Sequence, residues 1–373
     1  MAQARIESID VARGIAALSV AVYHHGVGAA LAGATGWGAF RLIGWPGATI
    51  AVPFFFVISG FCIHLGGLSQ TPDAAFARRF YLQRLIRIYP AWLVAVAISA
   101  LVLSLEGRDV PVSLLFSHFT LTNAFVDDYR LNAALWSVSV EWFLYLLYPF
   151  WLLLRKRSGL TVAALVAGLL SALSCLATHY FHPTRSGPAL WFFLNVWCGW
   201  VAGAVLAELW TFKGRARFSR PSWWVVGATC TSVHVALVAQ GSYTGPWQYL
   251  SLPITICLFV WPLALLLVAG ESLMERDVSA LARLMWKGLA GVGAFSYSLY
   301  LLHIPIQSIR FLVWPAVPRI PFLQAIALAA WLGLVLWLSF LSYRWVELPT
   351  SSLGRRILRR SAAKMAIAQA SNP

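Results

Sequence analysis

Two side chains that are rare inside membrane helices, Arg13 and His24, lie eleven residues apart in the first long apolar stretch of the sequence. Eleven residues of α-helix make three turns with about 20° left over, so both side chains project from one face. Along that face they are separated by roughly 16 Å, about half the thickness of a bilayer core. Ionisable residues within membrane helices are costly and are functional candidates. The adjacent His25 points about 100° away and is not an equivalent copy.

Two further residues, Glu141 and His303, are expected at the depth of His24. Counting along the predicted helices places both imidazoles roughly 20 Å above the inner surface and Glu141 about 8 Å below the outer surface. An imidazole and a carboxylate at one depth in an apolar medium predict a contact between His24 and Glu141. In such a pair the carboxylate fixes the tautomer of the imidazole, which removes a proton from a hydroxyl group. His303 stands two residues before Pro305 and could face the same cavity.

Ser59 and Ser139 are candidate cavity-lining residues close to these positions in the predicted bundle. Each could contact the substrate or act as an acylated nucleophile. No nucleophile-elbow pattern surrounds either serine, and the alternative is that they are small helix-packing residues.

Basic and aromatic residues gather at the expected cytoplasmic ends of the helices: Arg13, Arg84, Arg87, Tyr89, Tyr343 and Arg344. Guanidinium groups that converge on one opening suit phosphates, through charge-assisted and often bidentate hydrogen bonds. The alternative is that cytoplasmic helix ends are rich in arginine in any membrane protein. Arg13 is favoured as a ligand because it shares a face with His24, whereas Glu347 could simply neutralise Arg344.

The composition predicts an all-α polytopic membrane protein. Hydrophobic residues make up 60% of the 373 residues and charged residues only 11%, against roughly 25% charged in soluble domains. Ten apolar runs have the length of a membrane span, at 11–31, 48–68, 88–105, 136–154, 160–180, 188–211, 222–240, 248–270, 289–313 and 321–347. We expect one membrane domain over residues 1–373, with a basic cytoplasmic tail from about residue 350 that lies on anionic lipid.

The net charge of +15 reflects topology and not nucleic-acid binding. With the N-terminus inside, twenty lysines and arginines fall in cytoplasmic segments and five in outer segments. This asymmetry predicts that both termini are cytoplasmic. Within the basic set, residues 78–90 resemble an amphipathic cytoplasmic helix that leads into the third span.

The remaining candidates for chemistry are weak. The five cysteines lie in apolar segments without metal-ligand spacing, so we expect neither a metal site nor disulfides. The first apolar run is too long for a cleavable signal peptide and lacks its cleavage site. The other histidines are expected to be structural or interfacial: His64, His118, His179, His182 and His234.

The chain resembles the acyltransferase-3 family of membrane proteins, which modify bacterial surface glycans and lipids. Six segments carry the resemblance in the family's order: Arg13 with His24 eleven residues later, Pro53–Phe61, Arg84–Pro90, Leu135–Glu141, Phe295–His303 and Ser342–Glu347. Two positions depart from it, because Trp142 and Ala51-Val52 stand where many relatives carry an acid. We expect no soluble hydrolase-like domain of the kind that some relatives carry, which leaves transfer to the membrane domain or to a partner.

The resemblance implies transfer of an acyl group, most often acetyl, from cytoplasmic acyl-CoA to a sugar hydroxyl. The implied acceptor is a surface polysaccharide or a lipid-linked sugar, and the implied location is the bacterial inner membrane. On this hypothesis the protein holds no permanent cofactor, and acetyl-CoA is a donor substrate. Its phosphates are held near Arg13, Arg84 and Arg87, its pantetheine follows the Arg13–His24 face, and His24 acts as the base.

Two other classes remain open from the sequence. Intramembrane His, Arg and Glu also serve proton-coupled exporters, although we find no internal repeat of the kind many transporters show. The fold could instead serve as a binding partner in an export complex. The acceptor sugar, the acyl chain, direct transfer against an acyl-enzyme, and the oligomeric state, including a homo-oligomer, are not fixed by the residues.

Overall fold

The computed structural model describes residues 6–126, 130–181, 192–213, 259–275, 279–313 and 320–356, with two isolated positions at 225 and 229. Every regular element in these ranges is a helix, which confirms the all-α prediction. The first half comprises α1 (Glu7–His24), α2 (Val27–Thr35), η1 (Gly38–Ile43), α3 (Trp45–Thr49), α4 (Ala51–Gly67), α5 (Ala74–Leu105), α6 (Val112–Phe119) and η2 (Asn123–Phe125). The second comprises α7 (Trp136–Phe181), α8 (Phe192–Asn195), α9 (Trp197–Lys213), α13 (Val260–Glu275), α14 (Ala280–Ala294), α15 (Ser296–Val313), α16 (Pro321–Ser342) and the π-helical turn η4 (Tyr343–Glu347).

The prediction of ten spans is confirmed only in part. Among the described residues, four helices are long and apolar enough to cross a membrane, or six if each of two bent pairs is one span. The expected spans 136–154 and 160–180 are the two arms of α7, which meet at Gly159 with a φ of 84°. The expected span 222–240 lies outside the described residues apart from its two isolated positions. The orientation of the termini stays a prediction.

Two expected spans, 11–31 and 289–313, are each broken into a bent pair of helices. The axes of α1 and α2 differ by 59°, and those of α14 and α15 by 72°. At the first break Gly26 adopts a φ of 68°, a left-handed conformation that glycine tolerates. His24 is therefore the last residue of α1, not the middle of a straight span.

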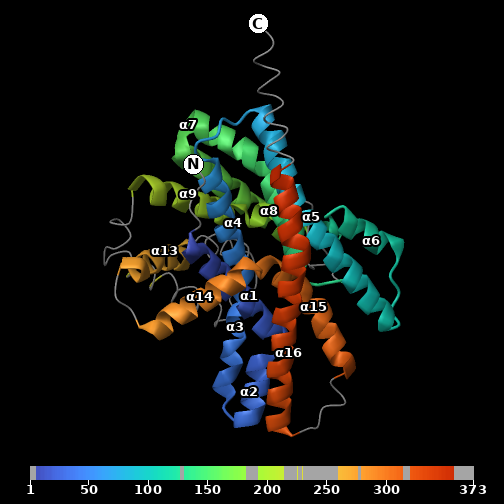
Figure 1. The fold of residues 1–373 in the computed structure, drawn as a ribbon. Coiled ribbons are helices and arrows are strands. Elements are labelled where there is room, and N and C mark those ends of the chain that lie inside the picture. The colour runs from blue at the N-terminus through green and yellow to red at the C-terminus, as the bar shows by residue number, and fades with distance from the viewer. Residues whose placement is uncertain are drawn as a thin grey trace.

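The helices α1 and α14 lie side by side (Figure 1) and cross at glycine. A Cβ on Gly14 would lie 2.2 Å from the carbonyl oxygen of Leu289, and one on Gly293 would lie 1.7 Å from that of Asp10. Such backbone contact is open only to residues without a side chain. This crossing fixes the helix that carries Arg13 and His24.

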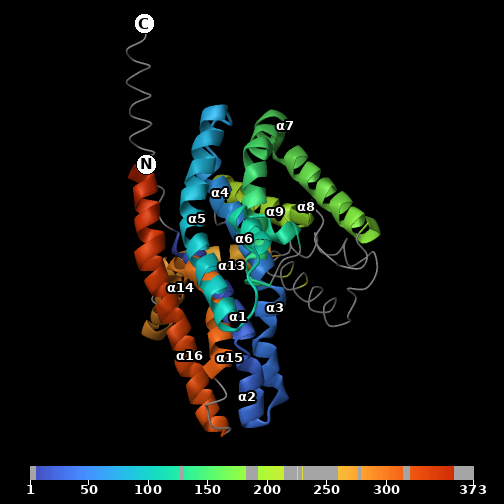
Figure 2. The ribbon, with the colours of Figure 1, turned by 90° about the vertical axis from the view of Figure 1, so that its right-hand side faces the viewer.

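The helix α5 is one continuous helix over two elements that the sequence predicted one after the other. Its 32 residues include both the expected amphipathic cytoplasmic helix at 78–90 and the expected span at 88–105, with Pro90 inside. The Asp73 side chain caps its start by accepting a hydrogen bond from the amide of Phe76 at 2.7 Å. Figure 2 shows α5 and α16 running through most of the height of the molecule.

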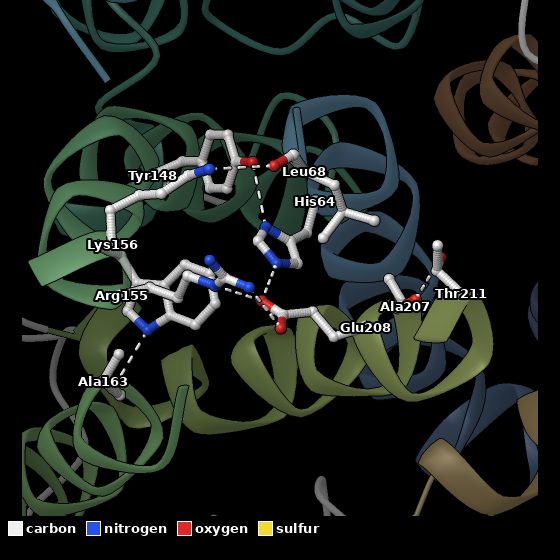
Figure 3. A network of polar contacts seen from close by, with 10 residues as sticks. His64, Leu68, Tyr148, Arg155, Lys156, Ala163, Ala207, Glu208 and Thr211 are labelled. Carbon is white, nitrogen blue, oxygen red and sulfur yellow. Dashed lines mark hydrogen bonds and ion pairs between the residues drawn. The ribbon is translucent and has the colours of Figure 1, made fainter. Parts of the chain in front are cut away.

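A buried polar network ties α4, α7 and α9 together (Figure 3). His64 Nε2 lies 2.8 Å from Glu208 Oε1, and the same carboxylate accepts two hydrogen bonds from Arg155, at 2.6 and 2.7 Å. The other ring nitrogen of His64 contacts the hydroxyl of Tyr148 at 3.2 Å. A buried carboxylate is tolerated when it is paired and hydrogen-bonded in this way, and the expected structural role fits His64.

Candidate active site

One pocket gathers polar side chains from α1, α4, α5, α7 and α15. Its ionisable and hydroxyl-bearing lining residues are Arg13, Ser59, Cys62, Arg84, Arg87, Ser137, Glu141, Tyr145, Ser296, Tyr297 and Tyr300. The structure thus brings together five residues singled out in the sequence: Arg13, Ser59, Arg84, Arg87 and Glu141. Three arginines and one glutamate line this pocket, so its net charge favours an anionic ligand.

Two of the pocket arginines are held differently. Arg13 donates a hydrogen bond from Nη2 to Cys62 Sγ at 3.5 Å, and its Nη1 lies 3.9 Å from Asp10 Oδ1. The Arg84 guanidinium lies 5.7 Å from the ring centre of Phe80 and 5.9 Å from that of Tyr145. Its buried Nε has no hydrogen-bond partner within the described part of the chain. A donor left in this state suits a bound acceptor such as a phosphate.

A directional chain of hydrogen bonds holds Glu141. The Tyr145 hydroxyl donates to Glu141 Oε1 at 2.6 Å. Because that proton is used, the Tyr145 oxygen accepts from Ser59, whose Oγ lies 3.2 Å away. Ser59 in turn accepts from the indole N–H of Trp200 at 3.3 Å. The carboxylate is thereby fixed in the pocket with one oxygen committed to Tyr145.

The expected contact between His24 and Glu141 is not formed. His24 Nδ1 lies 3.1 Å from the carbonyl oxygen of Val20 and 3.2 Å from Nε2 of His303. The partner of His24 is therefore the third predicted residue of this layer, His303, while Glu141 is paired with Tyr145. An equal depth in the membrane leaves the lateral position of a residue free, so depth alone could not select the right partner.

Tyr300 connects the pocket with the two imidazoles. Its hydroxyl lies in the pocket wall, 2.7 Å from Ser137 Oγ. Its ring centre lies 5.6 Å from that of His303, and its carbonyl oxygen lies 2.7 Å from His303 Nδ1. The imidazole pair adjoins the pocket through this residue and does not line it.

The other predicted site residues lie away from the central pocket. Ser139 is fully buried and donates to Asn123 Oδ1, and the Tyr89 hydroxyl donates to the carbonyl of Phe119 at 2.8 Å. Arg344 is exposed. Arg344 and Glu347, both within the described residues, form no ion pair, and the Glu347 carboxylate accepts a hydrogen bond from Ser298 at 3.1 Å.

Tyr343 lines a second pocket that adjoins the first. Arg84 and Arg87 belong to both pockets, and Glu347 and Arg355 are the other charged residues that line the second. Tyr343 and Glu347 are the first and last residues of η4. π-Helical turns often occur at functional sites.

Several site residues were not recognised from the sequence: Cys62, Tyr145, Trp200, Tyr297 and Tyr300. Tyr145 could have been found, because it lies four residues after Glu141 and so faces it on a helix. Trp200 reaches Ser59 from a distant helix, and no local spacing signals that contact.

The helical bundle, its apolar spans and its polar central pocket define a multi-pass membrane protein with an internal site. Residues 6–352 match the family model for the acyltransferase-3 group, described as an acyltransferase domain, and the chain belongs to that family. It is thus a membrane acyltransferase, and this family membership favours the enzyme over the exporter that the sequence left open. No curated protein and no solved structure matches the chain.

Proposed function

We propose that this protein transfers an acyl group, acetyl in the first instance, from cytoplasmic acyl-CoA to a hydroxyl of a surface polysaccharide or a lipid-linked sugar in the bacterial inner membrane. The observation that carries the proposal is the pocket that Arg13, Arg84 and Arg87 line together with Glu141. Family membership supplies the reaction class, and the residues of the pocket suit an anionic donor.

The negative charges of the donor phosphates determine where we expect the donor to bind. Its phosphates bind where the two pockets share Arg84 and Arg87, with Tyr343 and Arg355 on the far side. The pantetheine arm then extends into the central pocket past Arg13. This agrees with the roughly 16 Å of helix between Arg13 and His24, a length that an extended pantetheine spans. Tyr89 and Arg344 are not needed in this arrangement.

The chemistry needs a base and a proton carrier. His24 removes the proton of the acceptor hydroxyl, whose oxygen forms a bond to the thioester carbon. The C–S bond breaks, and the protonated His24 returns its proton to the CoA thiolate. Glu141, held by Tyr145, balances part of the positive charge of the pocket arginines and accepts a hydrogen bond from the donor through its remaining lone pairs.

The test uses the purified chain in lipid nanodiscs with radiolabelled acetyl-CoA and an extract of cell-envelope glycans and lipids. We expect an alkali-labile acetyl ester on one acceptor, identified by mass spectrometry of envelopes with and without the protein. His24→Ala should abolish the ester while the protein still inserts and folds. Retained transfer would remove His24 as the base, and absence of any new ester with the wild type would count against the proposed reaction. Labelled protein in the absence of acceptor would indicate an acyl-enzyme in place of direct transfer.

A further inference from the structure

The hydrogen bonds around His24 and His303 determine which ring nitrogens carry protons. A backbone carbonyl only accepts hydrogen bonds, so a ring nitrogen that contacts one must carry the proton. His303 Nδ1 lies 2.7 Å from the carbonyl oxygen of Tyr300 and is therefore an N–H group. In the neutral ring the other nitrogen, Nε2, is then an acceptor.

The same reasoning applies to His24. Its Nδ1 lies 3.1 Å from the carbonyl oxygen of Val20 and is also an N–H group. This proton is shared with the Nε2 acceptor of His303, which lies 3.2 Å away. Both carbonyls and the contact between the rings are satisfied by a single choice of tautomers. The remaining nitrogen of His24, Nε2, keeps a free lone pair.

Burial and a second contact hold this arrangement. His303 is fully buried, whereas His24 is half-buried. The ring centres are 4.9 Å apart. One turn after His303 on α15, the side-chain amide of Gln307 donates to the backbone carbonyl of His24. The end of α1 is thus attached to α15 at both the backbone and the ring of His24.

We infer that His303 is the positioning residue of the proposed base, with the role that the sequence assigned to Glu141. It accepts the Nδ1–H of His24 and leaves Nε2 of His24 to take the proton of the acceptor hydroxyl. Once Nε2 is protonated, the bond from Nδ1–H to His303 becomes charge-assisted and is strengthened. The inference rests on the proposed function, because it assigns a partner to the same base.

The first test replaces the acceptor nitrogen. His303→Leu removes it, while His303→Gln offers the amide oxygen at a similar reach. For His303→Leu we expect kcat to fall about 100-fold, the lower end of what a general base contributes, with an unchanged KM for acetyl-CoA. His303→Gln should recover most of that loss. The matched control is His118, another fully buried histidine with Nδ1 on a backbone carbonyl one turn earlier, where the Leu and Gln variants should have equal kcat.

The second test is made on the wild-type protein and does not depend on whether variants of His303 fold. The ¹⁵N chemical shifts of histidine-labelled wild-type protein, with His24 assigned by its loss in His24→Ala, report which ring nitrogen carries the proton. We expect the Nδ1–H form for His24, the minor form of free histidine. The Nε2–H form, an unchanged kcat in His303→Leu, or equal losses in the Leu and Gln variants would each overturn the role of His303. In that case the proposed function would still stand, provided that the wild-type protein transfers acetyl and the His24→Ala variant does not.

Discussion

At the scale of single residues, the charged groups of the pocket differ in whether they have a partner within the protein. Glu141 is fixed by Tyr145, and Arg13 has Cys62 and Asp10 beside it. Arg84 has aromatic rings as neighbours and forms no ion pair with any residue that the structure describes. A guanidinium whose buried Nε has no hydrogen-bond partner among the described residues is suited to anchor an anionic substrate, since an unmet donor gains most from a ligand.

Replacing Arg84 should therefore weaken donor binding. A hydrogen bond to a charged group contributes about 1.5–3 kcal/mol, so Arg84→Gln should raise the KM for acetyl-CoA roughly 10- to 100-fold. Arg84→Lys should recover part of this loss, because lysine keeps the charge but not the planar group. The measurement is initial rate against acetyl-CoA concentration in nanodiscs. The control is Arg78, which is exposed on the same helix and lines none of the pockets described. If Arg78→Gln raised the KM equally, the effect of Arg84→Gln would be one of general surface charge and not of donor binding.

The hydroxyl of Tyr145 should matter for catalysis as well as for stability. Tyr145→Phe releases Glu141 and leaves Ser59 without its acceptor, at a cost of about 1–3 kcal/mol for the unmet buried groups. We expect a loss of kcat/KM of about tenfold and a lower melting temperature in detergent. Tyr81→Phe removes a comparable hydrogen bond, from the Tyr81 hydroxyl to the carbonyl of Leu146 at 2.9 Å, outside the central pocket. It should lower stability without the loss of activity; equal activity of the two variants would contradict the role given to Tyr145.

At the scale of helices, apolar runs were good guides to where helices occur and poor guides to where they bend. The sequence predicted one apolar span that continues past His24 and Gly26, where the structure has a left-handed glycine and a bend of 59°. It also predicted a cytoplasmic helix at 78–90 that leads into the span at 88–105, and the structure makes the two one continuous helix, α5, with Pro90 inside. Hydropathy measures transfer from water and carries no information about φ angles or about neighbours that support a proline.

The crossing of α1 and α14 gives a test at this scale. In Gly293→Ala the new Cβ meets the backbone of Asp10 and forces the helices apart, at about 1–3 kcal/mol for an overpacked contact. The expected result is a lower melting temperature and a loss of transfer activity, since α1 carries Arg13 and His24. Gly291 lies on the same helix with open space around its Cβ position. Gly291→Ala should be neutral or stabilise by up to about 1 kcal/mol through helix propensity, and equal melting of the two variants would count against close packing here.

At the scale of the whole molecule, much of the candidate site was predictable because its residues are unusual for their surroundings. Arg13, Arg84 and Glu141 were found as charges in or beside apolar helices, and the structure places them in one pocket. Their partners were not predictable, because partners depend on how the helices are arranged around one another. Glu141 and His24 illustrate this, since they were assigned to one layer and lie in different hydrogen-bond networks.

The same arrangement predicts from which side of the membrane the pocket opens. Cys62 is half-buried, accepts a hydrogen bond from Arg13, and lines both the central pocket and a neighbouring one with Gln70 and Arg79. With the basic ends of the helices in the cytoplasm, an impermeant thiol reagent should reach this residue from the cytoplasmic side alone. The measurement is labelling of a variant whose sole cysteine is Cys62, in inside-out and right-side-out vesicles.

If the donor follows the proposed path past Cys62, acetyl-CoA should slow this labelling. A variant whose sole cysteine is Cys175, which is fully buried and lines none of the pockets described, should stay unlabelled from both sides and so controls for reagent leakage. Labelling of Cys62 from the outer side alone would reverse the orientation that the arginines predict. Labelling from the inner side without protection by acetyl-CoA would keep that orientation and move the donor to a different path.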